Sequence, residues 1–163
     1  MSKKITLRYL PKKLTKSDRD KQAKMLLKSR KLYKKGKYYT RDPVKSFKSK
    51  PSKHVAKAIK TYKIDKISPR ALAKPTKCSK KSLEKIVKKG EGAYYSSGSR
   101  PNQTAQSWGI ARLASSVTAG KAAAVDYTIL KKGCKSGSLA LKLAEKAKKK
   151  HNNGQRRVPK TRI

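Results

Sequence analysis

The first amphipathic pattern lies within the N-terminal forty residues. Apolar side chains recur there at helical spacing among many lysines, at Ala23, Leu26, Leu27 and Tyr33. Thr15 or Ser17 precedes this pattern and has the side chain of a helix N-cap, whereas Gly36 is a residue that commonly ends a helix. The spacing therefore predicts one helix that begins after Thr15 or Ser17 and ends at Gly36.

A second, shorter pattern follows a segment without periodicity. Pro43 and Pro51 interrupt the stretch after Gly36, which we interpret as an extended linker. Apolar residues then stand at i, i+3, i+4 and i+7, at Val55, Ala58, Ile59 and Tyr62. This spacing predicts a short amphipathic helix.

Two further helices are predicted in the lysine-rich segment that comes next. Ser68 followed by Pro69 is a typical helix start, and Ser79 is a second N-cap. An apolar stripe then follows at Leu83, Ile86 and Val87. Two short helices joined by a tight turn resemble a helix-turn-helix, but Pro75 interrupts the first helix and Lys77 replaces the usual turn glycine. We therefore favour a plain helical hairpin and keep DNA reading by residues 68–90 as the alternative.

The stretch GEGAYYSSGSRPNQT, residues 90–104, is nearly uncharged. We predict that the preceding helix ends at Gly90 and that residues 94–100 form an ordered loop, because glycines free the backbone there. Tyrosine, serine and asparagine supply adaptable contact area, so we expect the loop to contact the small core or another protein chain rather than nucleic acid. Its one arginine has a planar fork that fits a carboxylate. The candidate interface residues are Tyr94, Tyr95, Ser97, Arg100 and Asn102.

The C-terminal half contains two more helical patterns and one strand pattern. Helices are predicted in residues 102–117 and 136–147, each after a polar N-cap. Between them, apolar residues alternate with polar ones at Val125, Tyr127 and Ile129. This alternation predicts a strand at residues 124–130.

Together these elements predict an α+β fold that is mainly helical, with a small compact centre and long basic extended arms. Hydrophobic residues make up 35% of the chain, below the roughly 45–50% of ordinary globular domains, so the core must be small. The predicted core residues are Trp108, Leu113, Val125, Tyr127, Ile129, Leu139 and Leu143, with Leu83 and Ile86 docked onto them.

Charge divides the chain into three parts. The 163 residues include 47 Lys+Arg and 8 Asp+Glu, a formal net charge of +39. Residues 1–90 hold 32 of the basic residues, residues 91–130 hold 3, and residues 131–163 hold 12. The predicted organisation is a basic N-terminal helix and extended arm (1–52), a small α+β domain (53–147) and a basic C-terminal tail (148–163). The domain comprises basic helices (53–90), a near-neutral centre (91–130) and a last helix (136–147).

Like charges in this number repel one another, so we expect the protein to bind an anionic partner. We expect that partner to be DNA or the headgroups of an inner membrane. The candidate polyanion-binding residues are the adjacent cations Lys12, Lys13, Lys34, Lys35, Lys88, Lys89, Lys148, Lys149, Lys150, Arg156 and Arg157.

Several classes of function lack the residues they need. No apolar run approaches the ~20 residues that span a bilayer. The N-terminus has no signal-peptide core, so we expect a protein that is made and kept on the cytosolic side. Cys78 and Cys134 fit that expectation as two buried thiols, without the clustered ligands that a metal needs. Glu91 and Asp126 are the only carboxylates of the near-neutral centre, so we expect no catalysis, no cofactor and no small-molecule substrate.

The block from Lys88 to Cys134, KKGEGAYYSSGSRPNQTAQSWGIARLASSVTAGKAAAVDYTILKKGC, resembles the signature of an uncharacterised protein family encoded by large nucleocytoplasmic DNA viruses, such as those of algae and amoebae. The stretches YLPKKLTKSDRDKQAKMLLKSRKLYKKGKYYTR and SKPSKHVAKAIKTYKI are similar to what precedes that block in such proteins. The family is classed by a domain of unknown function, so the resemblance implies no catalytic residues. It implies a viral origin and, for a small basic protein, a component of the virion.

Three functions compete on this basis. The first is a minor capsid protein, which would cement other capsid proteins and contact acidic capsid surfaces, membrane headgroups or packaged DNA. The second is a non-specific DNA-binding or condensing protein of the virion core, and the third is a ribosomal-type RNA-binding protein. The near-neutral centre favours the first, because a DNA condenser does not need such a surface.

Overall fold

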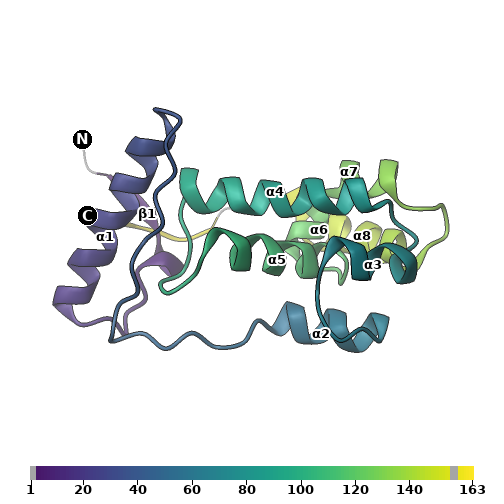
Figure 1. Ribbon diagram of the computed structural model, residues 1–163, viewed down its shortest axis with the longest axis horizontal. Coiled ribbons are helices and arrows are strands. Elements are labelled where there is room, and N and C mark those ends of the chain that lie inside the picture. Colours follow the sequence, from purple (N-terminus) through teal and green to yellow (C-terminus); the bar gives the residue numbers. More distant parts are fainter. Residues whose placement is uncertain (1–2, 155–157) are drawn as a thin grey trace. The chain divides into compact units, whose positions relative to one another are not determined.

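The computed structural model describes residues 3–154 and 158–163, and this part of the chain is mainly helical (Figure 1). Its α-helices are α1 (Lys16–Tyr33), α2 (Lys53–Tyr62), α3 (Pro69–Thr76), α4 (Lys80–Ser96), α5 (Ala105–Ser116), α6 (Lys121–Val125), α7 (Tyr127–Gly133) and α8 (Leu139–Lys150). The other elements are the strands β1 (Lys4–Thr6) and β2 (Lys160–Arg162) and the 3₁₀ turns η1 (Leu7–Tyr9) and η2 (Asn152–Gly154). The predicted mainly helical α+β fold is confirmed.

The chain folds into two compact units. The first unit comprises the described residues within 1–50, 91–108 and 157–163, and the second comprises those within 51–90 and 109–156. The chain passes from one unit to the other within α4 and again within α5. The segment 91–130, expected as one centre, therefore contributes to both units. The expected long basic arms are not confirmed, because much of the N-terminal segment is regular structure that belongs to the first unit.

In the first unit, α1 supplies the apolar face that the sequence predicts. It begins after Thr15, whose hydroxyl accepts a hydrogen bond from the Asp18 backbone N–H at 3.2 Å. Two small apolar clusters form around this helix: Ile5, Tyr9, Leu10, Ala23 and Leu26 in one, and Leu14, Met25 and Val44 in the other. Strands β1 and β2 pair antiparallel, with Ile5 opposite Thr161. The segment between α1 and α2 has no regular structure, as the linker prediction expects (Figure 1).

The second unit contains the larger core. Serine side chains cap three of its helices: Ser68 and Ser138, which are among the predicted caps, and Ser52, which was not predicted. The core includes the predicted residues Leu83, Ile86 and Leu113, which are fully buried. Tyr62 is also buried there, and its hydroxyl donates to the carbonyl of Val117 at 2.6 Å. Burial raises the pKa of Tyr62 to about 12.

The strand predicted at residues 124–130 is wrong. These residues belong to α6 and α7, which meet at Asp126. The buried apolar side chains here are Ala123 and Ala124 in α6 and Leu130 in α7, whereas Val125 is 46% exposed. The alternation of apolar and polar residues did not correspond to burial.

The helix end predicted at Gly90 is also wrong, because α4 continues to Ser96. Gly90 lies against α5 within the second unit. A Cβ added at Gly90 would stand 2.6 Å from the Cα of Gly109, closer than side chains tolerate. The glycine therefore permits close approach of two helices rather than ending one.

Three predicted core residues are corrected by the structure. Val125 and Leu139 are largely exposed, at 46% and 49%. Trp108 is partly buried in the first unit, where its ring lies edge-on to Tyr9 with centroids 6.1 Å apart. Both exposed residues stand next to buried ones, because Ala124 and Ala140 face the core in their place.

Cys78 and Cys134 are buried but are not free thiols. They form a disulfide that links the turn between α3 and α4 to the end of α7. Hydrogen bonds from Ser79 N–H to the Gly133 carbonyl and from Lys135 N–H to the Lys77 carbonyl flank the pair. The prediction of free thiols is wrong. Because disulfides are rare in the cytosol, the cysteines no longer support the prediction that the protein stays on the cytosolic side.

Candidate nucleic-acid interface

The predicted polyanion-binding lysines lie on the surface of both units. In the first unit, Lys12 and Lys13 follow η1, and Lys34 and Lys35 follow the last residue of α1. In the second unit, Lys88 and Lys89 lie on α4, and Lys148, Lys149 and Lys150 form the last turn of α8. All nine are exposed. Arg156 and Arg157 lie outside the described residues.

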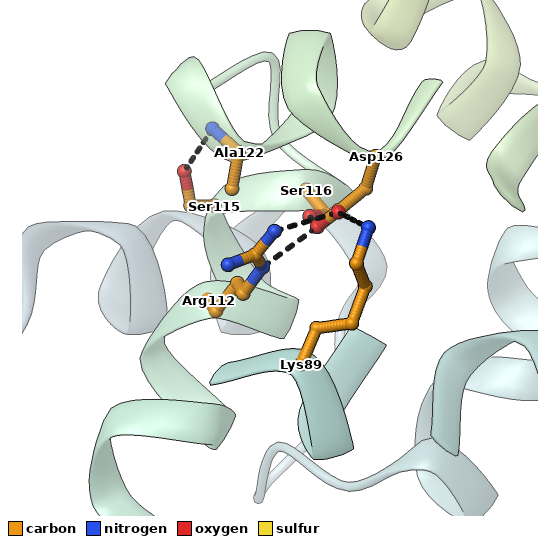
Figure 2. Close-up of polar contacts among 6 residues, drawn as sticks. All are labelled: Lys89, Arg112, Ser115, Ser116, Ala122 and Asp126. Atoms are coloured by element: carbon orange, nitrogen blue, oxygen red, sulfur yellow. Dashed lines mark hydrogen bonds and ion pairs between the residues drawn. The ribbon is translucent and has the colours of Figure 1, made fainter. Parts of the chain in front are cut away.

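One of these lysines also takes part in a buried ionic cluster (Figure 2). The side chain of Asp126 is completely buried, and its Oδ1 accepts from Arg112 Nη2 at 2.8 Å and from Lys89 Nζ at 3.4 Å. Its Oδ2 accepts from Arg112 Nε at 2.9 Å and from the Ser116 hydroxyl at 3.1 Å. Lys89, which is half-exposed, therefore shares its charge with an internal carboxylate.

The cluster joins three elements of the second unit. Lys89 comes from α4, Arg112 and Ser116 come from α5, and Asp126 stands at the junction of α6 and α7 (Figure 2). A buried carboxylate needs paired charges and hydrogen bonds, and this one has both. The arrangement fixes the helices that carry the basic surface. The sequence signal was present, since Asp126 and Arg112 are two of the few charges in residues 91–130.

The expected interface loop is the end of α4 and the turn after it. Tyr94 is fully buried, and its hydroxyl accepts from the Arg41 backbone N–H at 2.9 Å. Ser97 is exposed, and its carbonyl accepts from the guanidinium of Arg30. Tyr95 is half-buried. Much of this uncharged stretch therefore makes contacts inside its own unit.

Asn102 holds the linker segment to the same unit. Its backbone has φ of +62°, and its side-chain oxygen accepts from Val44 N–H at 2.7 Å. Its amide nitrogen donates to the carbonyls of Val44 and Phe47. Arg100 is exposed, and no described carboxylate lies within ion-pair distance of it.

Arg41 is a buried cation that the sequence did not single out. Its guanidinium lies 3.8 Å from the ring centroid of Tyr94, and Nη1 donates to the Ser29 hydroxyl and to the Tyr94 carbonyl. Nη2 donates to the Ser99 hydroxyl at 2.8 Å. Burial lowers the pKa of Arg41 from its ordinary value. Neutral oxygens and an aromatic face thus take the place of a carboxylate.

We expect Arg41→Ala to lower the free energy of unfolding by about 2–4 kcal/mol, because it leaves a cavity and unpaired acceptors in the first unit. Arg41→Lys should recover little of this lost stability, since one ammonium lacks the planar fork that reaches Ser99 and Tyr94 together. Urea denaturation of both variants measures the effect. Arg100→Ala is the matched control and should change stability by less than about 0.5 kcal/mol. An Arg41→Ala variant as stable as this control would contradict the assigned role.

The hairpin predicted at residues 68–90 is present as α3, a three-residue turn and α4. Lys77 ends α3 in the left-handed conformation, with φ of +57°, so a lysine occupies the position where glycine is usual. Five exposed lysines follow along α4, and they are Lys80, Lys81, Lys85, Lys88 and Lys89. Lys80 also pairs with Glu84 at 3.7 Å. The geometry presents positive charge and no feature that selects a base sequence.

A surface hollow of about 400 Å³ lies beside α8 and has Tyr127, Lys148 and Lys149 in its wall, together with Glu145 and Asn153. The ammonium of Lys148 lies 4.4 Å from the ring centroid of Tyr127. Among the described residues, no cluster of three metal-ligating side chains is present. None of the described helices is both long and apolar enough to cross a bilayer.

Comparison with known proteins gives one match. Residues 7–132 match a family of unknown function, DUF5824. No curated protein and no solved structure matches the chain. The matched range includes Arg41, Tyr94, Arg112 and Asp126, so it covers the buried Arg41 and the ionic cluster around Asp126.

Proposed function

We propose, from the premise that this chain belongs to the DUF5824 family, that it is a structural protein that binds nucleic-acid phosphates without sequence preference. The observation that carries the proposal is the net charge of +39 combined with the exposure of all nine described candidate lysines. The eight acidic residues are too few to neutralise the 47 basic ones, and one of them, Asp126, is paired inside the protein.

The chemistry of the surface supports backbone binding rather than base reading. Lysine ammonium groups are point charges that neutralise phosphates and release condensed counterions. Base reading usually relies on side chains that make two hydrogen bonds to one base, as arginine does to guanine and asparagine or glutamine to adenine. The exposed face of α4 is dominated by lysine instead.

The virion remains the proposed setting, since residues 88–134 resemble a protein family that large DNA viruses encode. A minor capsid protein is the second candidate and rests on this resemblance. The near-neutral stretch was the reason to place capsid contacts first. Because Tyr94 and Asn102 contact their own unit, we give priority to nucleic acid.

Duplex DNA affinity should fall steeply as salt rises, with a slope of about −0.9 in log–log form for each phosphate neutralised. Replacing Lys148, Lys149 and Lys150 together by glutamine should flatten that slope and weaken all DNA sequences equally. Fluorescence anisotropy over a salt series measures both. The triple lysine-to-arginine variant keeps the charge and is the control. Wild-type protein that fails to bind DNA at low salt would overturn the proposal.

A further inference from the structure

We infer that Tyr33, Tyr38 and Tyr95 form a platform on which the bases of single-stranded nucleic acid stack. This inference rests on the proposed function and narrows it to a ligand class. The uncharged sequence around Tyr95 is typical of a protein interface. The structure groups it with two tyrosines from a lysine-rich segment, and that grouping changes the expected partner.

The three rings form one cluster in the first unit. The Tyr38 and Tyr95 centroids are 5.0 Å apart, and Tyr33 lies 6.2 Å from Tyr38 and 6.4 Å from Tyr95. The rings of Tyr33 and Tyr95 are nearly parallel, with 9° between their planes. Tyr38 is 73% exposed and Tyr33 is 36% exposed, so the cluster presents aromatic surface to solvent.

Each ring is held by the chain beside it. Tyr33 is the last residue of α1, and Tyr95 lies on the last turn of α4. Tyr95 stands edge-on to the buried Tyr94, with centroids 5.1 Å apart. Residues held in this way lose little freedom when a ligand binds.

Alternation along the extended segment directs Tyr38 outward. Tyr39 is half-buried against the apolar cluster that contains Leu14, and Arg41 is buried. Tyr38 and Thr40, which alternate with them, are exposed. The buried side of the segment thus fixes the exposed position of the Tyr38 ring.

The charge around the rings suits a phosphate backbone. Residues 21–41 contain nine basic residues and no acidic residue. Lys34, Lys35 and Lys37 lie between two of the platform tyrosines and are exposed. Gly36 bends this turn, with φ of +72°. Proteins that bind single strands combine such a cationic track with aromatic rings, because every base has a flat face that stacks on them.

The geometry favours a single strand over a duplex. In a duplex, neighbouring base pairs cover the faces of each base, so exposed rings have nothing to stack on. In a single strand the faces are accessible, and stacking adds to the charge contribution. Tyr38 should therefore contribute to single-strand affinity and leave duplex affinity unchanged.

The test compares Tyr38→Ala with Tyr38→Trp in the full chain. The probes are a 20-nucleotide oligothymidine, a 20-base-pair duplex and heparin, each titrated by anisotropy at one salt concentration. Tyr38→Ala is expected to weaken oligothymidine binding by roughly 5- to 100-fold, and duplex and heparin binding by less than about twofold. Tyr38→Trp should keep the oligothymidine affinity. Leu139→Ala, at an exposed apolar residue of the second unit, should leave the oligothymidine affinity within about twofold of wild type.

Different results overturn different proposals. Unchanged oligothymidine affinity in Tyr38→Ala, or equal losses on all three probes, would overturn the stacking platform and leave phosphate binding in place. A wild-type chain that binds none of the probes would overturn the proposed function itself. Self-association that light scattering detects in wild type and that Tyr38→Ala abolishes, with oligothymidine affinity unchanged, would assign the rings to a protein contact and overturn the platform.

Discussion

Opening the Cys78–Cys134 disulfide is expected to lower the free energy of unfolding by about 4 kcal/mol. The two cysteines are 56 residues apart, and the bond restricts the unfolded chain over that whole length. The closed loop contains α4, α5, α6 and all of α7, and the residues of the ionic cluster lie within it. Urea denaturation with and without a phosphine reductant measures the difference.

The control for this prediction is the Cys78→Ala, Cys134→Ala double variant. It should have the lower stability in both conditions and should not respond to the reductant. Mass spectrometry of the intact wild-type chain after thiol alkylation shows whether the bond is present in the purified protein. A wild-type chain that is unlabelled by the alkylating reagent yet equally stable after reduction would contradict the assigned contribution.

Arg112→Ala should lower the free energy of unfolding by about 3 kcal/mol or more, because the buried carboxylate of Asp126 loses the two charged hydrogen bonds from the guanidinium. The loss arises mainly from the unpaired buried charge rather than from the missing attraction. Replacing both partners by apolar residues, as in Arg112→Met with Asp126→Leu, should cost less than the single change. Thermal and urea unfolding of the single and double variants measure the difference.

Glu84 offers a matched comparison for this prediction. Its pair with Lys80 is exposed, so Lys80→Ala should change stability by less than about 1 kcal/mol. If the double variant loses as much stability as the Arg112 and Asp126 single variants lose together, the two residues act independently. That outcome would remove the cluster as the element that holds α4, α5 and the α6–α7 junction.

Both predictions concern how a chain with so little apolar material keeps its basic surface ordered. Hydrophobic residues make up 35% of the sequence, and the net charge of +39 opposes compact folding. The disulfide and the ionic cluster lie in the second unit and add to its apolar core. Phosphate binding would relieve the same repulsion from outside.

Local signals were enough to locate most helices. Thr15, Ser52, Ser68 and Ser138 each accept a backbone hydrogen bond at the start of a helix, because a serine or threonine hydroxyl satisfies an N–H that the helix cannot. The apolar spacing that followed each cap gave the buried face. These features involve neighbours within a few residues, so the sequence by itself determined them. It likewise determined the overall charge, from which a polyanionic partner is proposed.

Contacts between distant segments were decided only by the tertiary structure. Gly90 lies inside a helix and permits the close approach of Gly109, and the carboxylate of Asp126 pairs with Arg112 at the junction of two helices where a strand was predicted. Cys78 meets Cys134 from 56 residues away, and Tyr38 and Tyr95 come together from different segments. The residues next to a glycine, a carboxylate, a thiol or an aromatic ring in the sequence do not indicate which distant residue it will contact. Their roles depend on which surfaces the packed helices bring within a few ångströms of one another.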